Sequence, residues 1–441
     1  MRKIAFALTI AAGVVFTSCS SDDNVIDEQS LTPTCTDDIQ NGDETGVDCG
    51  GTCTPCETGS ENPIENPATY AFEREGASTI DFSGQTTRLK MGGEFVSALS
   101  DTTNTAERLQ AMFAHEAGNA DFTDADLNAS DKNIKSKTAA SADLFAANAT
   151  DQAIIRSDFD GWITAQAEEV FVNWETTASP GVAGQVPQGE QVRYINAQGL
   201  EYNQMIAKGL IGALTLDQIV NNYLSPAVLD EGENRANNDA GKVEEGKPYT
   251  TMEHKWDEAY GYLFGLNTDT SNPVAGENDG DRFLGSYIGQ VAEDPDFSDL
   301  ITASYEAFKL GRAAIVAKDY AVRDEQAAII KSKLALVPSV RGVFYLQAGK
   351  NALAEEVPNY GGGFHALSEA FGFIYSLQFA QNPATGKAYF IKAEVDALLE
   401  QLLDDGENGL WDVTPETLDA ISETIASKFG FTVEQAAPER A

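Results

Sequence analysis

Two segments of this chain repeat one pattern of histidine, glutamate and glycine. Residues 254–266 read HKWDEAYGYLFGL and residues 365–377 read HALSEAFGFIYSL, so His, Glu, Ala, Gly and Leu recur at identical offsets. A tyrosine stands five positions before each histidine, at Tyr249 and Tyr360. Side chains four positions apart on a helix lie on one face, with Cβ atoms roughly 5–6 Å apart. Each segment therefore offers one imidazole and one carboxylate in the same direction.

Two such helices that face each other would form a four-ligand metal site, as His and Glu pairs do in di-iron bundles. Imidazole and carboxylate ligands suit iron or zinc. We expect His254, Glu258, His365 and Glu369 to converge as ligands, with Asp257, Tyr249 and Tyr360 as additional candidates. Two alternatives stay open: each glutamate orients its own histidine inside a polar core, or the pairs contact an organic ligand or a partner.

Gly261 and Gly372 occupy matched positions inside the repeated helices. Glycine costs roughly 1 kcal/mol relative to alanine in a helix interior, so we expect a neighbouring backbone or a bulky aromatic ring to approach closely at both. The Tyr and Phe residues around the two glycines are expected to be core residues.

The first residues are typical of an exported lipoprotein. Arg2 and Lys3 precede an apolar run over residues 4–16, too short to span a bilayer, which leads into Cys19. Residues 1–18 are thus predicted to be a signal peptide. The residues around Cys19 resemble a lipobox, and the Ser-Asp-Asp run behind it resembles the surface-export signal of Bacteroidetes lipoproteins. The resemblance implies a lipid anchor on Cys19, an outer-membrane or cell-surface location, and a flexible tether over residues 19–34.

Four more cysteines lie close together between this tether and the rest of the chain, which contains none: Cys35, Cys49, Cys53 and Cys56. An even number in one short exported segment predicts two disulfides, with the pairing left open. Residues 35–56 are thus expected to be a stapled spacer module. The acidic residues between the cysteines would suit calcium, and the spacing of Cys53 and Cys56 would also suit zinc. Residues 57–67 are expected to be a linker.

The net charge of −40 excludes nucleic acid as a partner, since such a field repels phosphate backbones. Beyond the linker, apolar residues recur at helical spacing, and alanine is frequent. We predict an all-α domain over residues 68–431, with a small β-hairpin within residues 69–91 around Ser83 and a tail over residues 432–441. The repeated segments start 111 positions apart, too far for a solenoid repeat of about 20–50 residues. A duplicated helical bundle with two pseudo-repeated halves is the better prediction. The predicted helices cover residues 95–99, 109–113, 144–147, 154–172, 195–224, 256–266, 300–315, 334–353, 367–379, 395–403 and 418–429.

Residues 194–213 (YINAQGLEYNQMIAKGLIGA) and 217–224 (DQIVNNYL) resemble the signature of the DUF4856 family of Bacteroidetes lipoproteins, with a resemblance that runs from about Tyr70 to Phe431. More distantly, the chain is similar to imelysin-like proteins (peptidase M75), which implies an all-α, two-bundle fold and a link to iron uptake. Their Gly-x-His-x-x-Glu motif is altered here. Asp257 and Ser368 occupy the position of its acid, and Met252 replaces its glycine in the first segment, whereas Gly363 retains it in the second.

These observations predict a lipid-anchored surface protein that binds a metal ion, iron first, or an iron chelate, and delivers it to an uptake receptor in the outer membrane. One alternative is a structural, glycan-binding or partner-binding scaffold that uses Trp162, Trp174 and Trp411. The other is an imelysin-like metallopeptidase. The third histidine, His115, begins a zincin-like motif, but Asn119 stands where the second histidine ligand is required.

Overall fold

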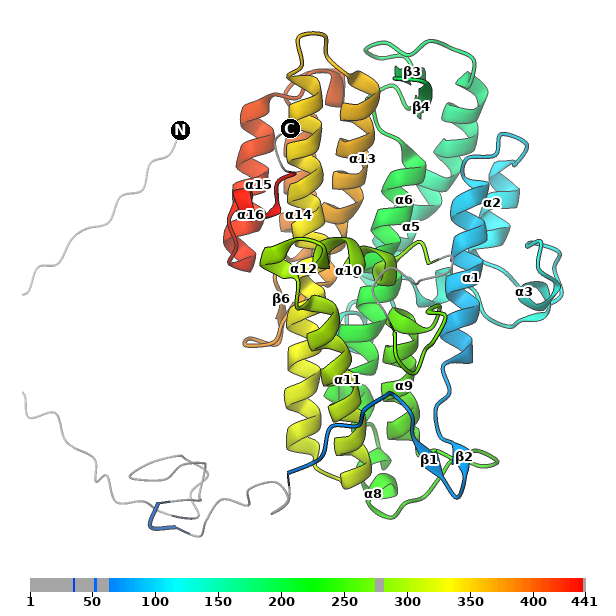
Figure 1. The fold of residues 1–441 in the computed structure, drawn as a ribbon. Coiled ribbons are helices and arrows are strands. Elements are labelled where there is room, and N and C mark those ends of the chain that lie inside the picture. The colour runs from blue at the N-terminus through cyan, green and yellow to red at the C-terminus, as the bar shows by residue number, and fades with distance from the viewer. Residues whose placement is uncertain (1–34, 36–50, 54–62, 274–280, 439–441) are drawn as a thin grey trace, which may run out of the picture. The chain divides into compact units, whose positions relative to one another are not determined.

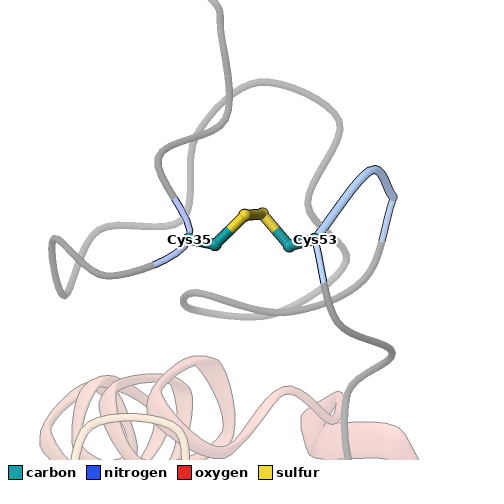
Figure 2. The surroundings of a disulfide bond; sticks show 2 residues. All are labelled: Cys35 and Cys53. Carbon is teal, nitrogen blue, oxygen red and sulfur yellow. A yellow bond between two sulfur atoms is a disulfide. The ribbon is translucent and has the colours of Figure 1, made fainter.

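The computed structural model describes Cys35 and residues 51–53, 63–273 and 281–438. The chain divides into two compact units, Met1–Glu61 and Asn62–Ala441, at a point inside the predicted linker. In the first unit Cys35 and Cys53 form a disulfide bond (Figure 2). This bond confirms disulfide formation in the cysteine-rich module. Cys19, Cys49, Cys56 and the acidic residues considered for calcium lie outside the described residues.

The second unit is built from helices, which confirms the predicted all-α class (Figure 1). Its longer helices are α1 (Ser83–Ala98), α5 (Ala149–Ala165), α6 (Tyr202–Leu210), α9 (Thr251–Phe264), α10 (Leu284–Ala292), α11 (Leu300–Ala317), α12 (Tyr320–Leu353), α13 (Tyr360–Ser376), α14 (Lys392–Leu403) and α15 (Pro415–Phe429). The shorter helices are α2 (Ala106–Phe113), α3 (Ala125–Ala129), α4 (Ala142–Phe145), α7 (Pro226–Leu229), α8 (Asn234–Asp239) and α16 (Val433–Ala436).

Helix α12 is the longest element, and several others pack along it. Its most extensive contacts are with α13, α11 and α15. Figure 1 shows α11 beside one half of α12, and α13 and α15 beside the other half. The buried apolar side chains of these helices belong to one continuous core that also includes α1, α6 and α9. In the described part of the chain, no helix combines the length and the apolar character that crossing a membrane requires.

The predicted hairpin at the domain start is present, but its turn lies earlier in the chain than expected. Strands β1 (Glu73–Arg74) and β2 (Ala77–Ser78) pair antiparallel, and Glu75 and Gly76 make the turn with φ of 54° and 80°. Ser83, where the turn was predicted, is instead the first residue of α1. The hairpin therefore does not extend to residue 91, because Leu89, Met91 and Phe95 form the buried face of that helix.

Four further segments differ from the prediction. The helix expected from residue 195 begins at Tyr202, because Ile195 ends a second hairpin of β3 (Gly184–Gln188) and β4 (Gln191–Ile195). Beyond α6 the chain continues through two π-helical segments, η4 (Ile211–Leu216) and η5 (Ile219–Tyr223). A third short pair joins β5 (Gln381–Asn382) to β6 (Lys387–Ala388). The predicted tail contains α16, which is capped by reciprocal hydrogen bonds between Thr432 and Gln435.

Candidate functional site

The two repeated segments form buried helices, as predicted. Helix α9 begins after Thr250, whose hydroxyl accepts the N–H of Glu253 while the Glu253 carboxylate accepts the N–H of Thr250. Helix α13 begins after Asn359, whose side chain accepts the N–H of Gly362. The neighbours of the two helices differ: α9 packs mainly against η5, α1 and α11, whereas α13 packs mainly against α12 and α6.

Both matched glycines are required by a close approach, as expected. A Cβ on Gly261 would lie 2.3 Å from Cβ of Phe82, the residue before α1. A Cβ on Gly372 would lie 2.5 Å from Cβ of Lys208 and 2.9 Å from the carbonyl oxygen of Met205, both on α6. Each repeated helix therefore uses its glycine to sit tightly against one partner helix, α1 for the first repeat and α6 for the second.

In the first repeat the carboxylate of Glu258 is held by an amide and a lysine. It accepts a hydrogen bond from Nε2 of Gln85 at 2.9 Å and pairs with Nζ of Lys255 at 2.7 Å. Burial alone would raise the pKa of Glu258, but Lys255, His254 and the hydrogen bonds hold it below its usual value. The His254 ring stacks on Tyr249, with centroids 4.6 Å apart, and its buried Nδ1 has no hydrogen-bond partner in the part of the chain that the structure describes.

Asp257, an additional candidate ligand, belongs to a buried ionic network. Its Oδ1 accepts hydrogen bonds from Nε of Arg312 at 3.0 Å and from the Tyr70 hydroxyl at 2.6 Å. Burial raises the pKa of Asp257 to about 6, although Arg312 opposes that shift. These contacts tie the segment before the first hairpin to α9 and α11. Tyr249, another candidate, donates its hydroxyl to Asp81 at 3.1 Å.

In the second repeat His365 lies between two carboxylates. Its Nδ1 is 3.2 Å from Oε1 of Glu201, and its Nε2 is 3.9 Å from Oε1 of Glu369. The side chains of Glu201 and Glu369 are only 3% and 7% exposed, whereas that of His365 is 21% exposed. Solvent therefore reaches the imidazole, while the carboxylates beside it are buried.

Glu201 is positioned by a serine on α13. Its backbone N–H donates to Oγ of Ser368, on α13, at 2.8 Å. The preceding loop is shaped by Asn196, whose side-chain oxygen accepts the N–H groups of Gln198 and Leu200 at 2.9 Å each. Ser368 thus helps to hold the carboxylate of Glu201 next to His365.

Glu369 also contacts a lysine from the neighbouring helix. Its Oε1 lies 2.9 Å from Nζ of Lys208 on α6. Burial alone would raise the pKa of Glu369, but Lys208 and His365 hold it below its usual value. In both repeats, the lysine that pairs with the glutamate also lies over a tyrosine ring. Nζ of Lys208 is 5.2 Å from the ring centroid of Tyr287, and Nζ of Lys255 is 5.6 Å from that of Tyr223.

Among the described residues, His254, Glu258, His365 and Glu369, which were expected to converge on one ion, do not form one group of potential metal ligands. Over residues 63–273 and 281–438, no group of three or more His, Cys, Asp or Glu side chains is arranged to hold a metal. One reason is that α9 and α13 pack against different helices. The three residues around His365 do not surround one ion either. Glu201 lies at Nδ1 of the imidazole and Glu369 at Nε2, so one ion cannot bind the histidine and both carboxylates.

Residues 67–432 match the family described as Domain of unknown function (DUF4856). The chain belongs to this family. The match spans both repeats, the Glu201 loop and nearly all of the helical unit, which confirms the resemblance to DUF4856. Neither the curated proteins nor the solved structures contain a match to this DUF4856 chain.

The remaining candidates of this DUF4856 protein lie apart from the His365 cluster or pack into the core. Tyr360 is 40% exposed and contacts Phe364 and Trp411. Nδ1 of His115 is 2.7 Å from Oδ2 of Asp121, and the ring is fully buried, as befits a structural histidine. The tryptophans considered for glycan binding are half-buried and pack against the core: Trp162, Trp174 and Trp411.

Proposed function

We propose that this chain is a lipoprotein, anchored through Cys19 at the outer membrane or cell surface, that captures iron or an iron chelate and delivers it to an uptake receptor. The observation that carries the proposal is the cluster of Glu201, His365 and Glu369, which combines a solvent-accessible imidazole with two buried carboxylates. The lipobox-like residues around Cys19 support the anchor.

The separation of Nε2 of His365 and Oε1 of Glu369 suits two ligands of one ion. Nitrogen and oxygen ligands lie about 2.0–2.2 Å from zinc, so two of them are at most about 4.3 Å apart. The observed distance of 3.9 Å falls within that limit. An imidazole and a carboxylate form a borderline-to-hard donor pair that also accepts iron.

Glu201 would act as the carboxylate that orients the ligand. Metal-binding histidines commonly donate their second ring N–H to a carboxylate, which fixes the tautomer and the ring orientation. Glu201 lies at hydrogen-bond distance from Nδ1. With the hydrogen on Nδ1, the lone pair of Nε2 faces Glu369.

Two protein ligands leave most coordination positions for water or a chelator, which favours a chelate over a bare ion. Cations beside the cluster match an anionic chelate: Lys208 pairs with Glu369, and Arg341 donates to the hydroxyl of Tyr345 at 2.6 Å. Arg341 is 8% exposed and forms no ion pair with any carboxylate that the structure describes. Binding at Glu369 requires that carboxylate to share or release Lys208.

Elemental analysis of the purified full chain tests the proposal. We expect about one equivalent of iron or zinc in the wild type and little in Glu369→Gln. The matched control is Glu258→Gln, which removes the equivalent carboxylate of the first repeat and should leave the metal content unchanged. A metal-free wild type, or equal losses in both variants, would refute metal capture at this cluster.

The anchor has a separate test. Cys19→Ser should abolish incorporation of labelled fatty acid and move the protein out of the membrane fraction. Lipid incorporation that persists in this variant would place the anchor elsewhere. Since this outcome does not depend on metal content, the two parts of the proposal can fail independently.

A further inference from the structure

A group of positive charges gathers beside the first repeat, although the chain as a whole carries a net charge of −40. Lys137 and Lys255 place Nζ 5.5 and 5.6 Å from the ring centroid of Tyr223. The positive charge of Arg88 also reaches Tyr223, where it partly offsets the effect of burial on the pKa of this tyrosine. These residues come from α1, α9, η5 and the short 3-10 turn η1 (Lys135–Lys137). We call Arg88, Lys137, Lys255, Tyr223 and Tyr262 the cationic cluster.

Over residues 63–273 and 281–438, two of its three cations form no ion pair with a carboxylate. Arg88 is 7% exposed, and its guanidinium donates to the backbone oxygens of Asn133 and Gly84, at 3.3 and 3.4 Å, and forms no ion pair with a carboxylate among the described residues. Lys137 forms no ion pair with any residue that the structure describes. Burial, followed by the charge of Arg88, lowers its pKa. Buried charges are normally paired with an opposite charge, so Arg88 and Lys137 each still lack an anionic partner among the described residues.

The tyrosines add unused hydroxyl donors. The hydroxyl of Tyr223 accepts a hydrogen bond from Nε2 of Gln85 at 3.3 Å, so its own proton remains available. The hydroxyl of Tyr262 is fully buried and makes no hydrogen bond of normal geometry to any described residue. Arg88 lies close enough to oppose the rise in the pKa of Tyr262 that burial causes. Within the described chain, the one carboxylate that pairs with the cations of the cluster is Glu258, bound to Lys255.

We propose that the cationic cluster binds a small oxyanion, the carboxylate or phosphate group of a soluble ligand. Among the described residues, Glu258 alone forms an ion pair with these three cations. The carboxylates of Asp131 and Asp217 act on Arg88 and Tyr262 through their charges without forming an ion pair with the cluster. The guanidinium fork and the free hydroxyls supply donors, and the oxygens of a carboxylate or phosphate supply the matching acceptors. A polyanion such as nucleic acid is disfavoured because the surrounding negative field repels it. This site shares no residue with the His365 cluster and does not rest on metal capture.

Calorimetric titration of the full chain with inorganic phosphate, and separately with citrate, tests the proposal. The titrations are run in His365→Ala, so that citrate cannot report binding through a metal. We expect saturable binding of at least one of the two anions. Lys137→Met should weaken it at least tenfold, and Tyr262→Phe, which removes only a hydroxyl, should weaken it several-fold.

The matched control is Lys135→Met, since Lys135 lies in the same turn but pairs with Asp160 at 2.7 Å. This variant should bind like its parent. Binding of phosphate alone would identify a phosphate-bearing ligand, binding of citrate alone a carboxylate-bearing one, and binding of both the shared oxyanion chemistry. Absence of binding, or equal losses in the Lys135 and Lys137 variants, would overturn the proposal. Unfolding midpoints of the variants show whether a loss of anion binding reflects misfolding. If Lys137→Met misfolds, the anion affinity of Tyr262→Phe tests the proposal in its place.

Discussion

The carboxylate of Glu201 lies 3.2 Å from Nδ1 of His365, although 164 residues separate the two along the chain. The contact joins the start of α6 to α13, and Ser368 strengthens it by accepting the N–H of Glu201. The histidine is thereby fixed with its other nitrogen toward Glu369. The first repeat has a different arrangement, in which His254 stacks on Tyr249 instead. The two copies of one sequence pattern therefore differ in the freedom of their histidines to bind a ligand.

Replacement of Glu201 by glutamine should weaken metal binding without unfolding the protein. Loss of an orienting carboxylate typically costs about 10–100-fold in metal affinity. Competition with a chromophoric chelator measures the affinity, and circular dichroism checks the helices. Glu168→Gln, at an exposed carboxylate, is the control. Unchanged affinity in Glu201→Gln would show that this contact does not support a metal ligand.

Gly372→Ala should destabilise the helical unit by about 1–3 kcal/mol, since the new methyl group would overpack α13 against α6. The nearest atoms include the backbone of Met205 and Gly209, which cannot move aside as a flexible side chain can. Gly342→Ala is the matched control, because its Cβ would meet no atom closer than 3.8 Å. That change should stabilise the helix by up to about 1 kcal/mol. Urea unfolding measures the free energy of unfolding of both variants. An unchanged value in Gly372→Ala would contradict the close packing of α13 against α6.

Arg312→Met should destabilise the protein strongly. Arg312 is fully buried and pairs with Glu253 and Asp257 at 3.2 and 3.0 Å. Removing one partner of a buried ion pair leaves an uncompensated charge and costs about 3–5 kcal/mol. Lys428→Met removes an exposed pair with Glu394 and should cost about 0–1 kcal/mol. Similar unfolding free energies for the two variants would argue against the buried network as a stabilising element.

The free energy of unfolding should rise as the pH falls from 7 toward 5. Burial raises the pKa of Asp217, Asp257 and Asp281 to about 6, from a usual value of 3.8. Between these values the folded state binds more protons than the unfolded state, so protonation favours folding. Asp81, whose pKa hydrogen bonds lower to about 2 despite burial, acts in the opposite sense below pH 4.

The test of this pH dependence is the urea midpoint at pH 7, 6 and 5. In Asp217→Asn the rise should become shallower, because one of the three titrating groups is absent. A midpoint that falls steadily from pH 7 to 5 in the wild type would contradict the raised pKa values.

Much of the helical content could be predicted because its apolar residues repeat at helical spacing. Helices α9 and α13 and the reason for Gly261 and Gly372 followed from the repeated pattern alone. Strands β3 and β4 were missed because Pro187 and several polar residues obscure their alternation, although Gly189 in the turn was a usable signal, with φ of 58°. Helix α10 was not predicted, although Leu284, Tyr287, Ile288 and Val291 recur at helical spacing and form its buried face.

The candidate site could be predicted only in part. Spacing of four residues places a histidine and a glutamate on one face of their own helix, but it carries no information about which helix lies opposite. Glu201 and Lys208 were missed for this reason, since neither belongs to the repeat. A glutamate between Leu200 and Tyr202 at the start of an apolar helix was the available signal. Lys255, present only in the first copy, likewise indicated that the two glutamates have different partners.

The most direct test of the account compares the two histidines. Calorimetric titration of the full chain with zinc and with ferric citrate is carried out for the wild type, His254→Ala and His365→Ala. We predict that the wild type and His254→Ala bind alike, whereas His365→Ala loses binding with its helical spectrum intact. Undiminished binding in His365→Ala, or no binding by the wild type, would contradict metal capture at His365.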